Sequence, residues 1–211
     1  MSTYNKISGQ RIQRIEALSD GLFSIAMTIL VFDLKDPVSD TLQSNTELLL
    51  SLKSLLPKLL TYFLSFMTLG IFWTGHSTQF NYIVKYDRNL SWYSLFFLLF
   101  VSIIPFTTNI LSNHIANELS IGIYWFNIFA LGTMLFIHWD YAYKHDYLSL
   151  HDEKKILVDQ AVRSRIRTAQ SLYFFCALLC FVSTYLSIAC IIAIQLNYAL
   201  GIVSSQTQRP E

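Results

Sequence analysis

The side chains best able to do chemistry lie in two apolar stretches of the sequence, where ionisable groups are rare. Asp20 follows Arg14 by about six residues in the first stretch, and His76 precedes Tyr82 by about six residues in the second. If the first stretch crosses a membrane and the second returns, both side chains lie at a similar depth. A carboxylate and an imidazole at that depth can hydrogen bond, and each is unfavourable in lipid without a partner.

Two interpretations of this pair are open. In the first, a polar staple holds the first apolar helix in register through hydrogen bonds, and its members are Arg14, Ser19, Asp20, Trp73 and His76. In the second, Asp20 and His76 form a proton relay or a pH sensor, because an imidazole titrates near neutral pH. The staple is the simpler hypothesis, since buried polar groups need partners whether or not they move protons.

The remaining titratable residues show no catalytic or metal-binding pattern. His138, beside Trp139 and Asp140, is predicted to lie at a membrane boundary. The histidines of the predicted loops lack the spacing of metal ligands to a carboxylate or cysteine. No nucleophile is paired with a base, and the three cysteines lie in an apolar stretch, which is typical of small buried side chains. We therefore expect no enzyme activity, no metal site and no cofactor.

The composition indicates a polytopic membrane protein. The 211 residues are 53% hydrophobic and only 14% charged, whereas soluble domains carry about 25% charge. A net charge of +1 gives no reason to expect nucleic-acid binding. The apolar run of residues 21–32 has the length of a signal-peptide core. Glu16 and Asp20 precede it where a signal peptide prefers positive charge, so we expect the helix to be retained.

The hydropathy pattern predicts an all-α protein with one membrane domain, residues 1–211, and six transmembrane helices. The predicted spans are about 14–34, 59–82, 90–111, 121–139, 169–183 and 185–203. The last two come from one apolar block that is too long for one span, with its break predicted at Ser183-Thr184. The charged segment 144–168 is expected to form a helical extension over the inner membrane face.

The basic residues favour one orientation of these spans. With six spans and an inside N-terminus, twelve of the fifteen Lys and Arg residues lie on the inner side, and only Lys35, Lys53 and Lys58 lie outside. An excess of basic residues marks the cytoplasmic side. Both termini are therefore expected in the cytosol, in a plasma membrane or cell inner membrane.

The first apolar stretch also carries an apolar seam. At 100° per residue, Leu18, Ile25, Ile29 and Phe32 fall on one face of the helix, and Asp20 lies on nearly the opposite side. Such a seam is most often part of the core or faces lipid. A seam directed away from an anchored face can also form the wall of a pore.

Three motifs resemble a known family. Arg14-x-x-x-Leu18-Ser19-Asp20 is one substitution from the Arg-x-x-x-Phe-Ser-Asp signature of the transmembrane protein 175 family of potassium channels. Phe72-Trp73-x-x-His76 and Phe100-Val-x-Ile-x-Pro105-Phe106 are similar to the family's second and third spans. The resemblance covers residues 11 to 112 well, and the rest only by the number of spans.

The resemblance implies a homotetramer in which the first helix of each subunit lines an axial pore permeable to potassium. The matching pore positions are Ile25, Thr28, Ile29 and Phe32. Narrow apolar rings exclude water unless they widen, and the Thr28 hydroxyl adds the ion-friendly oxygens on this face. Potassium sheds water more readily than sodium, so a modest preference for potassium is expected.

Carboxylates follow the first span. Asp33, Asp36 and Asp40, repeated in each subunit, would concentrate cations at the outer mouth. Two alternatives to the channel stay open: a small proton-coupled secondary transporter that uses Asp20 and His76, and a membrane scaffold without transport activity. Transporters usually show paired repeats or broken helices, which are not evident in this sequence.

Overall fold

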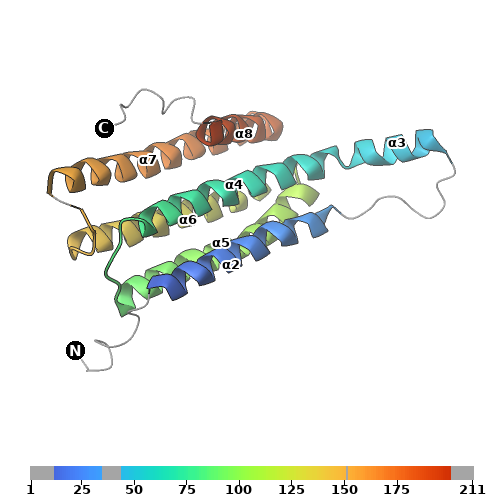
Figure 1. The fold of residues 1–211 in the computed structure, drawn as a ribbon. Helices are drawn as coiled ribbons and strands as arrows, with labels where there is room; N and C mark the ends of the chain where they lie inside the picture. The colour runs from blue at the N-terminus through green and yellow to red at the C-terminus, as the bar shows by residue number, and fades with distance from the viewer. Residues whose placement is uncertain (1–11, 35–43, 151, 201–211) are drawn as a thin grey trace.

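The computed structural model describes residues 12–34, 44–150 and 152–200, and these residues form a bundle of helices without any sheet. Helices α2, α4, α5, α6 and α7 run side by side, and α3 extends beyond one end of the bundle (Figure 1). The elements in chain order are α2 (Ile12–Ile29), the 3-10 helix η1 (Leu30–Asp33), α3 (Asn45–Ser54), α4 (Leu56–Phe80), α5 (Arg88–Asn113), α6 (Glu118–Lys144), α7 (Asp152–Leu178), the 3-10 helix η2 (Leu179–Phe181) and α8 (Thr184–Leu200).

Four of the described helical segments are long and apolar enough to cross a membrane. They are α2 with η1, α4, α5 and α6. The prediction of an all-helical membrane protein is thereby confirmed at this level. Helix α8 is apolar but has only 17 residues, or about 25 Å of helix against a hydrocarbon core of about 30 Å. The six-span count stays a prediction.

Side-chain caps start the two longest apolar helices. The Asp87 carboxylate accepts from the Leu90 backbone N–H at 2.8 Å, at the start of α5. The Asn117 side chain accepts from the Leu119 N–H at 2.9 Å, at the start of α6. Such caps satisfy backbone donors that the first turn of a helix leaves without partners. Tyr141 also donates to Asp87 at 2.7 Å, which ties the end of α6 to the start of α5.

The core lies where α4, α5 and α6 meet, and α2 packs onto it. Its fully buried members come from all three central helices and include Leu64, Leu69, Phe97, Val101, Tyr124, Ile128 and Leu131. Helix α2 contributes Phe23 and Ala26, and η1 contributes Leu30. The apolar residues at three- and four-residue spacing therefore form a buried stripe on each helix, as an amphipathic pattern predicts.

Most of segment 144–168, predicted as a helical extension, is helical, and its predicted place over the inner membrane face stays a prediction. Helix α7 begins at Asp152 and continues without a break to Leu178, alongside α6 rather than across the end of the bundle (Figure 1). Arg163 explains this course, because its guanidinium pairs with Asp140 of α6 at 2.8 Å and with Asp159 of its own helix at 2.7 Å. The pair with Asp140, together with the hydrogen bond from the Trp139 indole of α6 to Asp159 at 2.9 Å, holds the charged half of α7 against α6.

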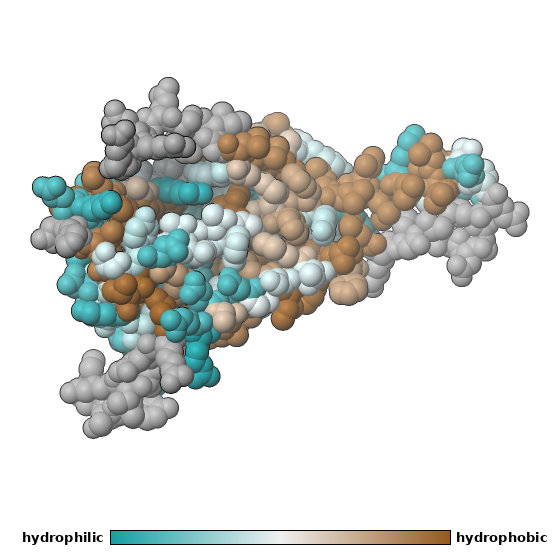
Figure 2. Space-filling model, in the orientation of Figure 1, coloured by the Kyte–Doolittle hydropathy of each residue, from teal (hydrophilic) through white to brown (hydrophobic). Residues whose placement is uncertain are grey.

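The chain then leaves the α-helical conformation after Leu178, passes through η2 and resumes as α8 at Thr184. Helices α7 and α8 thus form a hairpin whose turn contains Ser183. Hydrophilic residues gather at the end of the bundle where α2 and α7 begin, and hydrophobic residues cover much of the remaining visible surface (Figure 2). This distribution matches a bundle embedded in lipid with one polar end.

Candidate functional site

Helix α2 has one face against the bundle and one face directed away from it. Ser19, Phe23 and Ala26 are buried against α4 and α5. The apolar seam lies on the other side, where the exposed fractions are 59% for Ile25 and 71% for Phe32. The structure therefore brings the predicted seam together as a continuous exposed face on each chain.

Two hydroxyl residues interrupt this exposed face. Thr28 donates to the Ile25 carbonyl at 2.9 Å, and Ser24 donates to the Asp20 carbonyl at 2.8 Å. Both bonds stay within α2, so each hydroxyl oxygen keeps lone pairs for a second partner.

The polar staple forms, but with partners other than the predicted direct pair. Ser19 and His76 share a buried hydrogen bond of 3.0 Å between Oγ and Nδ1. The Trp73 indole donates to Asp20 at 2.8 Å. No hydrogen bond joins Asp20 to His76 in the described residues. One turn of α2 thus binds one turn of α4 through two parallel contacts.

Arg14 takes no part in these contacts. It is exposed, and among residues 12–34, 44–150 and 152–200 no salt bridge joins it to a carboxylate. The two contacts of the staple are therefore formed by α2 and α4 without the guanidinium.

His138, which the sequence predicts at a membrane boundary, is fully buried inside the bundle beside His76. The two ring centroids lie 5.3 Å apart. His138 Nδ1 and Gln79 Oε1 are 2.7 Å apart, and the Gln79 amide donates to the Leu135 carbonyl at 3.0 Å. The position of His138 next to Trp139 and Asp140 suggested an interface, but the packing of α6 against α4 buries it, one turn after Leu135.

A second buried polar cluster escaped the sequence analysis altogether. The Tyr124 hydroxyl lies 2.9 Å from Thr68 Oγ1 and 3.2 Å from Ser65 Oγ. Thr108 donates to Ser65 at 2.7 Å, and Gln195 of α8 donates to Thr68 at 2.7 Å. This cluster joins α4, α5, α6 and α8 inside the bundle. Isolated hydroxyls and amides in separate spans carry no spacing signal that would have grouped them.

The predicted acidic mouth is only partly visible. Asp33, in η1, accepts from the Asn109 side chain at 2.7 Å and is partly exposed. This bond fixes the end of the first span against α5. Asp36 and Asp40 lie outside the described residues.

Comparison with known proteins agrees with this arrangement. A family model described as "Endosomal/lysosomal potassium channel TMEM175" matches residues 14–105, which contain most of α2, the polar staple and most of α5. A potassium channel of Chamaesiphon minutus is 28% identical over 89% of this chain and 93% of its own length. The chain is thus similar to proteins of the TMEM175 family.

A solved structure extends the likeness beyond the matched segment. The crystal structure of a lysosomal potassium-selective channel TMEM175 homolog from Chamaesiphon minutus superimposes with a TM-score of 0.76 and 25% identity, over 89% of this chain and 96% of that chain. The structural likeness therefore extends well beyond residues 14–105, which the family model covers.

Other relatives differ in the ion that their names give. A Streptomyces collinus protein named potassium channel is 34% identical over 50% of this chain. The zebrafish protein is named endosomal/lysosomal proton channel TMEM175, and it is 32% identical over 49% of this chain but only 21% of its own length. TMEM175 relatives of this chain thus carry the names of two permeant ions.

Proposed function

We propose that this protein is a passive, potassium-permeable cation channel. The observation that carries the proposal is the exposed face of α2, in a chain that is similar to the TMEM175 family. The exposed seam residues Ile25, Ile29 and Phe32 leave a large apolar area without a partner in the single chain. Assembly of four copies around an axis would cover this area and enclose a pore.

The apolar rings would act as the barrier to ions. A narrow ring of branched apolar side chains is poorly wetted, and an ion crosses only when the ring widens or the ion loses water. Thr28 lies between Ile25 and Ile29, so its hydroxyl oxygen would offer a partner for a dehydrated cation. This order of side chains supports a modest preference for potassium over sodium.

The polar staple would position the pore-lining helix. Ser19 and Asp20 attach α2 to His76 and Trp73 of α4, on the face opposite to the seam. A helix held on one side by two hydrogen bonds can present its other side at a fixed angle. Asp33 would attract cations to the outer mouth, together with Asp36 and Asp40.

We further propose a multi-pass protein of the plasma membrane, with six spans and both termini in the cytosol. The excess of basic residues on the side of the N-terminus supports this orientation. Cysteine labelling at residues 3 and 207 in intact cells tests it. Labelling of either position from outside would contradict the proposed topology.

The proton channel names of the animal relatives favour one second candidate, a proton path that uses Asp20 and His76. In this chain Trp73 donates to Asp20, and Ser19 shares a hydrogen bond with His76. No hydrogen bond connects Asp20 to His76 in the described residues. Liposomes with a potassium gradient and a pH-sensitive dye separate the candidates. The proposal requires fast, non-saturating potassium flux from a particle with the mass of four chains. Saturating potassium flux that is coupled to proton movement would support a proton-coupled secondary transporter instead.

A further inference from the structure

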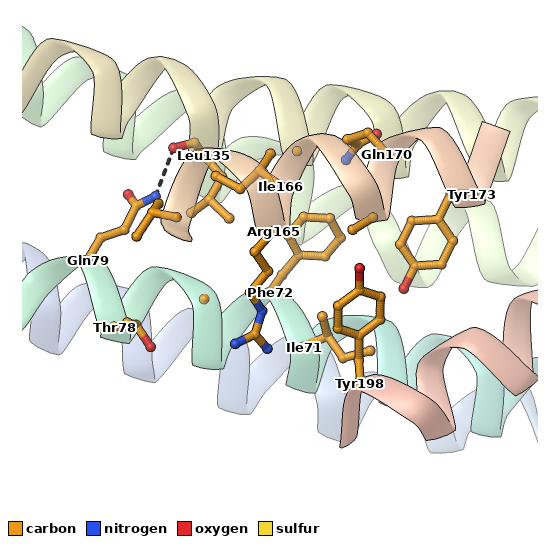
Figure 3. Close-up of a pocket in the computed structure, with 14 residues that line it drawn as sticks. Ile71, Phe72, Thr78, Gln79, Leu135, Arg165, Ile166, Gln170, Tyr173 and Tyr198 are labelled. Atoms are coloured by element: carbon orange, nitrogen blue, oxygen red, sulfur yellow. Dashed lines mark hydrogen bonds between the residues drawn. The ribbon is translucent and has the colours of Figure 1, made fainter. Parts of the chain in front are cut away.

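A partly enclosed cavity of about 70 Å³ lies between α4, α6, α7 and the end of α8, and none of its lining residues belongs to α2 (Figure 3). Its walls are mostly apolar, from side chains that include Ile71, Phe72, Leu135, Ile166 and Ala169. One buried water needs about 10–15 Å³ of such space and several polar partners. This cavity is larger and mostly apolar, and two polar atoms in its lining, Gln170 Oε1 and the Tyr173 hydroxyl oxygen, have no hydrogen-bond partner in the described residues. Hydrocarbon therefore suits most of its wall better than water does.

Arg165 is the charged residue of the lining. Its guanidinium reaches across the cavity toward α4 and lies 5.7 Å from the centre of the Tyr198 ring (Figure 3). Arg165 is exposed, so the cavity opens to the surface at this side chain. In the described ranges no salt bridge joins Arg165 to a carboxylate, whereas Arg163 pairs with Asp140 and Asp159.

The depth of Arg165 in the bundle suits a headgroup. It lies on the same turn of α7 as Arg163, whose partner Asp140 belongs to the charged end of α6. The apolar part of the lining continues from Arg165 along α7 to Ala169 and Tyr173, toward the middle of the bundle. The cavity thus has a cationic mouth near the polar end and an apolar interior.

We propose that this cavity binds an anionic phospholipid, with the phosphate on Arg165 and an acyl chain along the apolar lining. A guanidinium donates two parallel hydrogen bonds to phosphate, and a buried chain gains from leaving water. Charge complementarity selects this occupant over an uncharged lipid. The bound lipid fills the space between α4 and the α7–α8 hairpin and stabilises their packing.

The test uses the full-length protein in a neutral detergent. Binding of dioleoyl phosphatidylglycerol and of dioleoyl phosphatidylcholine is measured by native mass spectrometry, and stability by thermal unfolding. Arg165→Gln is expected to weaken phosphatidylglycerol binding about tenfold, through loss of a charge-assisted contact. Arg165→Lys keeps the charge and should retain most of the binding. Arg167→Gln is the matched control, because Arg167 is exposed one turn from Arg163 and does not line the cavity.

A second variant tests the interior of the cavity. Ala169→Phe fills the apolar lining without changing the charge, and it is expected to weaken binding of the long-chain lipid while thermal unfolding in phosphatidylcholine stays close to that of the native protein. Competition by glycerol phosphate as strong as that by the lipid would overturn the proposal in favour of a simple phosphate site.

Other outcomes also decide against a lipid. Equal binding of phosphatidylglycerol by Arg165→Gln and the native protein would overturn the proposal. Equal losses of phosphatidylglycerol binding in Arg165→Gln and Arg167→Gln would also overturn it, because they would indicate general electrostatic attraction to the protein surface. If deletion of residues 201–211 were required before any lipid binds, the occupant would be the chain's own C-terminal segment.

Discussion

The hydrogen bond between Ser19 and His76 allows a quantitative test of how α2 is held. Both residues are almost fully buried, and the bond measures 3.0 Å. The Nε2 atom of His76 has no hydrogen-bond partner in the part of the chain that the structure describes. Ser19→Ala therefore leaves the whole imidazole without a partner there. A buried polar group in that state lowers the free energy of unfolding by about 1–3 kcal/mol.

The reverse change should have a similar effect. His76→Phe keeps a ring next to Phe80 and Phe97, whose centroids lie 4.6 and 4.5 Å from that of His76. It removes the partner of the Ser19 hydroxyl, which again lowers the free energy of unfolding by about 1–3 kcal/mol. The double variant leaves neither group unpaired. The double variant should therefore lose about 1–3 kcal/mol less unfolding free energy than the sum of the two single losses, and this difference is the coupling energy.

Denaturant titration of the detergent-solubilised protein measures all three losses, and size-exclusion chromatography with light scattering measures assembly. Additive losses would refute the staple, because they would mean that Ser19 and His76 do not depend on each other. Normal assembly combined with a changed pH dependence of flux in Ser19→Ala or His76→Phe would support the proton relay instead.

Three further predictions concern the pore, its mouth and the packing of α7. Thr28→Val should lower the potassium preference in bi-ionic reversal potentials with little change in stability, since it deletes only the hydroxyl; an unchanged preference argues against a role in selectivity. Asp33→Asn should reduce potassium conductance at 0.01 M salt and much less at 1 M, where the screening length is only about 3 Å; equal reductions contradict the electrostatic account. Gly132→Ala should lower the thermal unfolding temperature, because its Cβ would lie 1.5 Å from the Gln170 amide nitrogen. Gly122→Ala, with no atom within 4 Å of its Cβ, should be neutral and serves as the control.

The sequence predicted the elements that depend on local patterns. Long apolar runs indicated the spans, and the spacing of Leu18, Ile25, Ile29 and Phe32 indicated one face of α2, which the structure leaves exposed. Helical periodicity alone decides which residues share a face, so this part needs no tertiary information.

The contacts between helices could not be predicted in the same way. The sequence placed Asp20 and His76 at a similar depth, but the rotation of α4 decides that Trp73 binds Asp20 while His76 binds Ser19. His138 was predicted at a boundary because of its neighbours along the chain. Its burial follows from the packing of α6 against α4, which no local pattern encodes.

The course of α7 shows the same limit. The charge of this segment predicts a place at the membrane surface, but its course along α6 follows from the ion pair of Arg163 with Asp140 and from the hydrogen bond of Trp139 to Asp159. These carboxylates lie on different helices, and only the three-dimensional arrangement reveals that they share one guanidinium.

The central claim is that the exposed face of α2 lines the ion path, and Ile25→Asn tests it most directly. The control is Leu99→Asn on α5, because Leu99 is 50% exposed and Ile25 is 59% exposed, so both variants place an amide at a comparably exposed apolar position. Potassium flux into liposomes is measured for both variants at equal amounts of assembled protein. We predict that Ile25→Asn raises the flux and lowers the preference for potassium over sodium, since four amides would wet an apolar ring, while Leu99→Asn changes neither. Unchanged flux in Ile25→Asn, in protein that still assembles, would contradict the account.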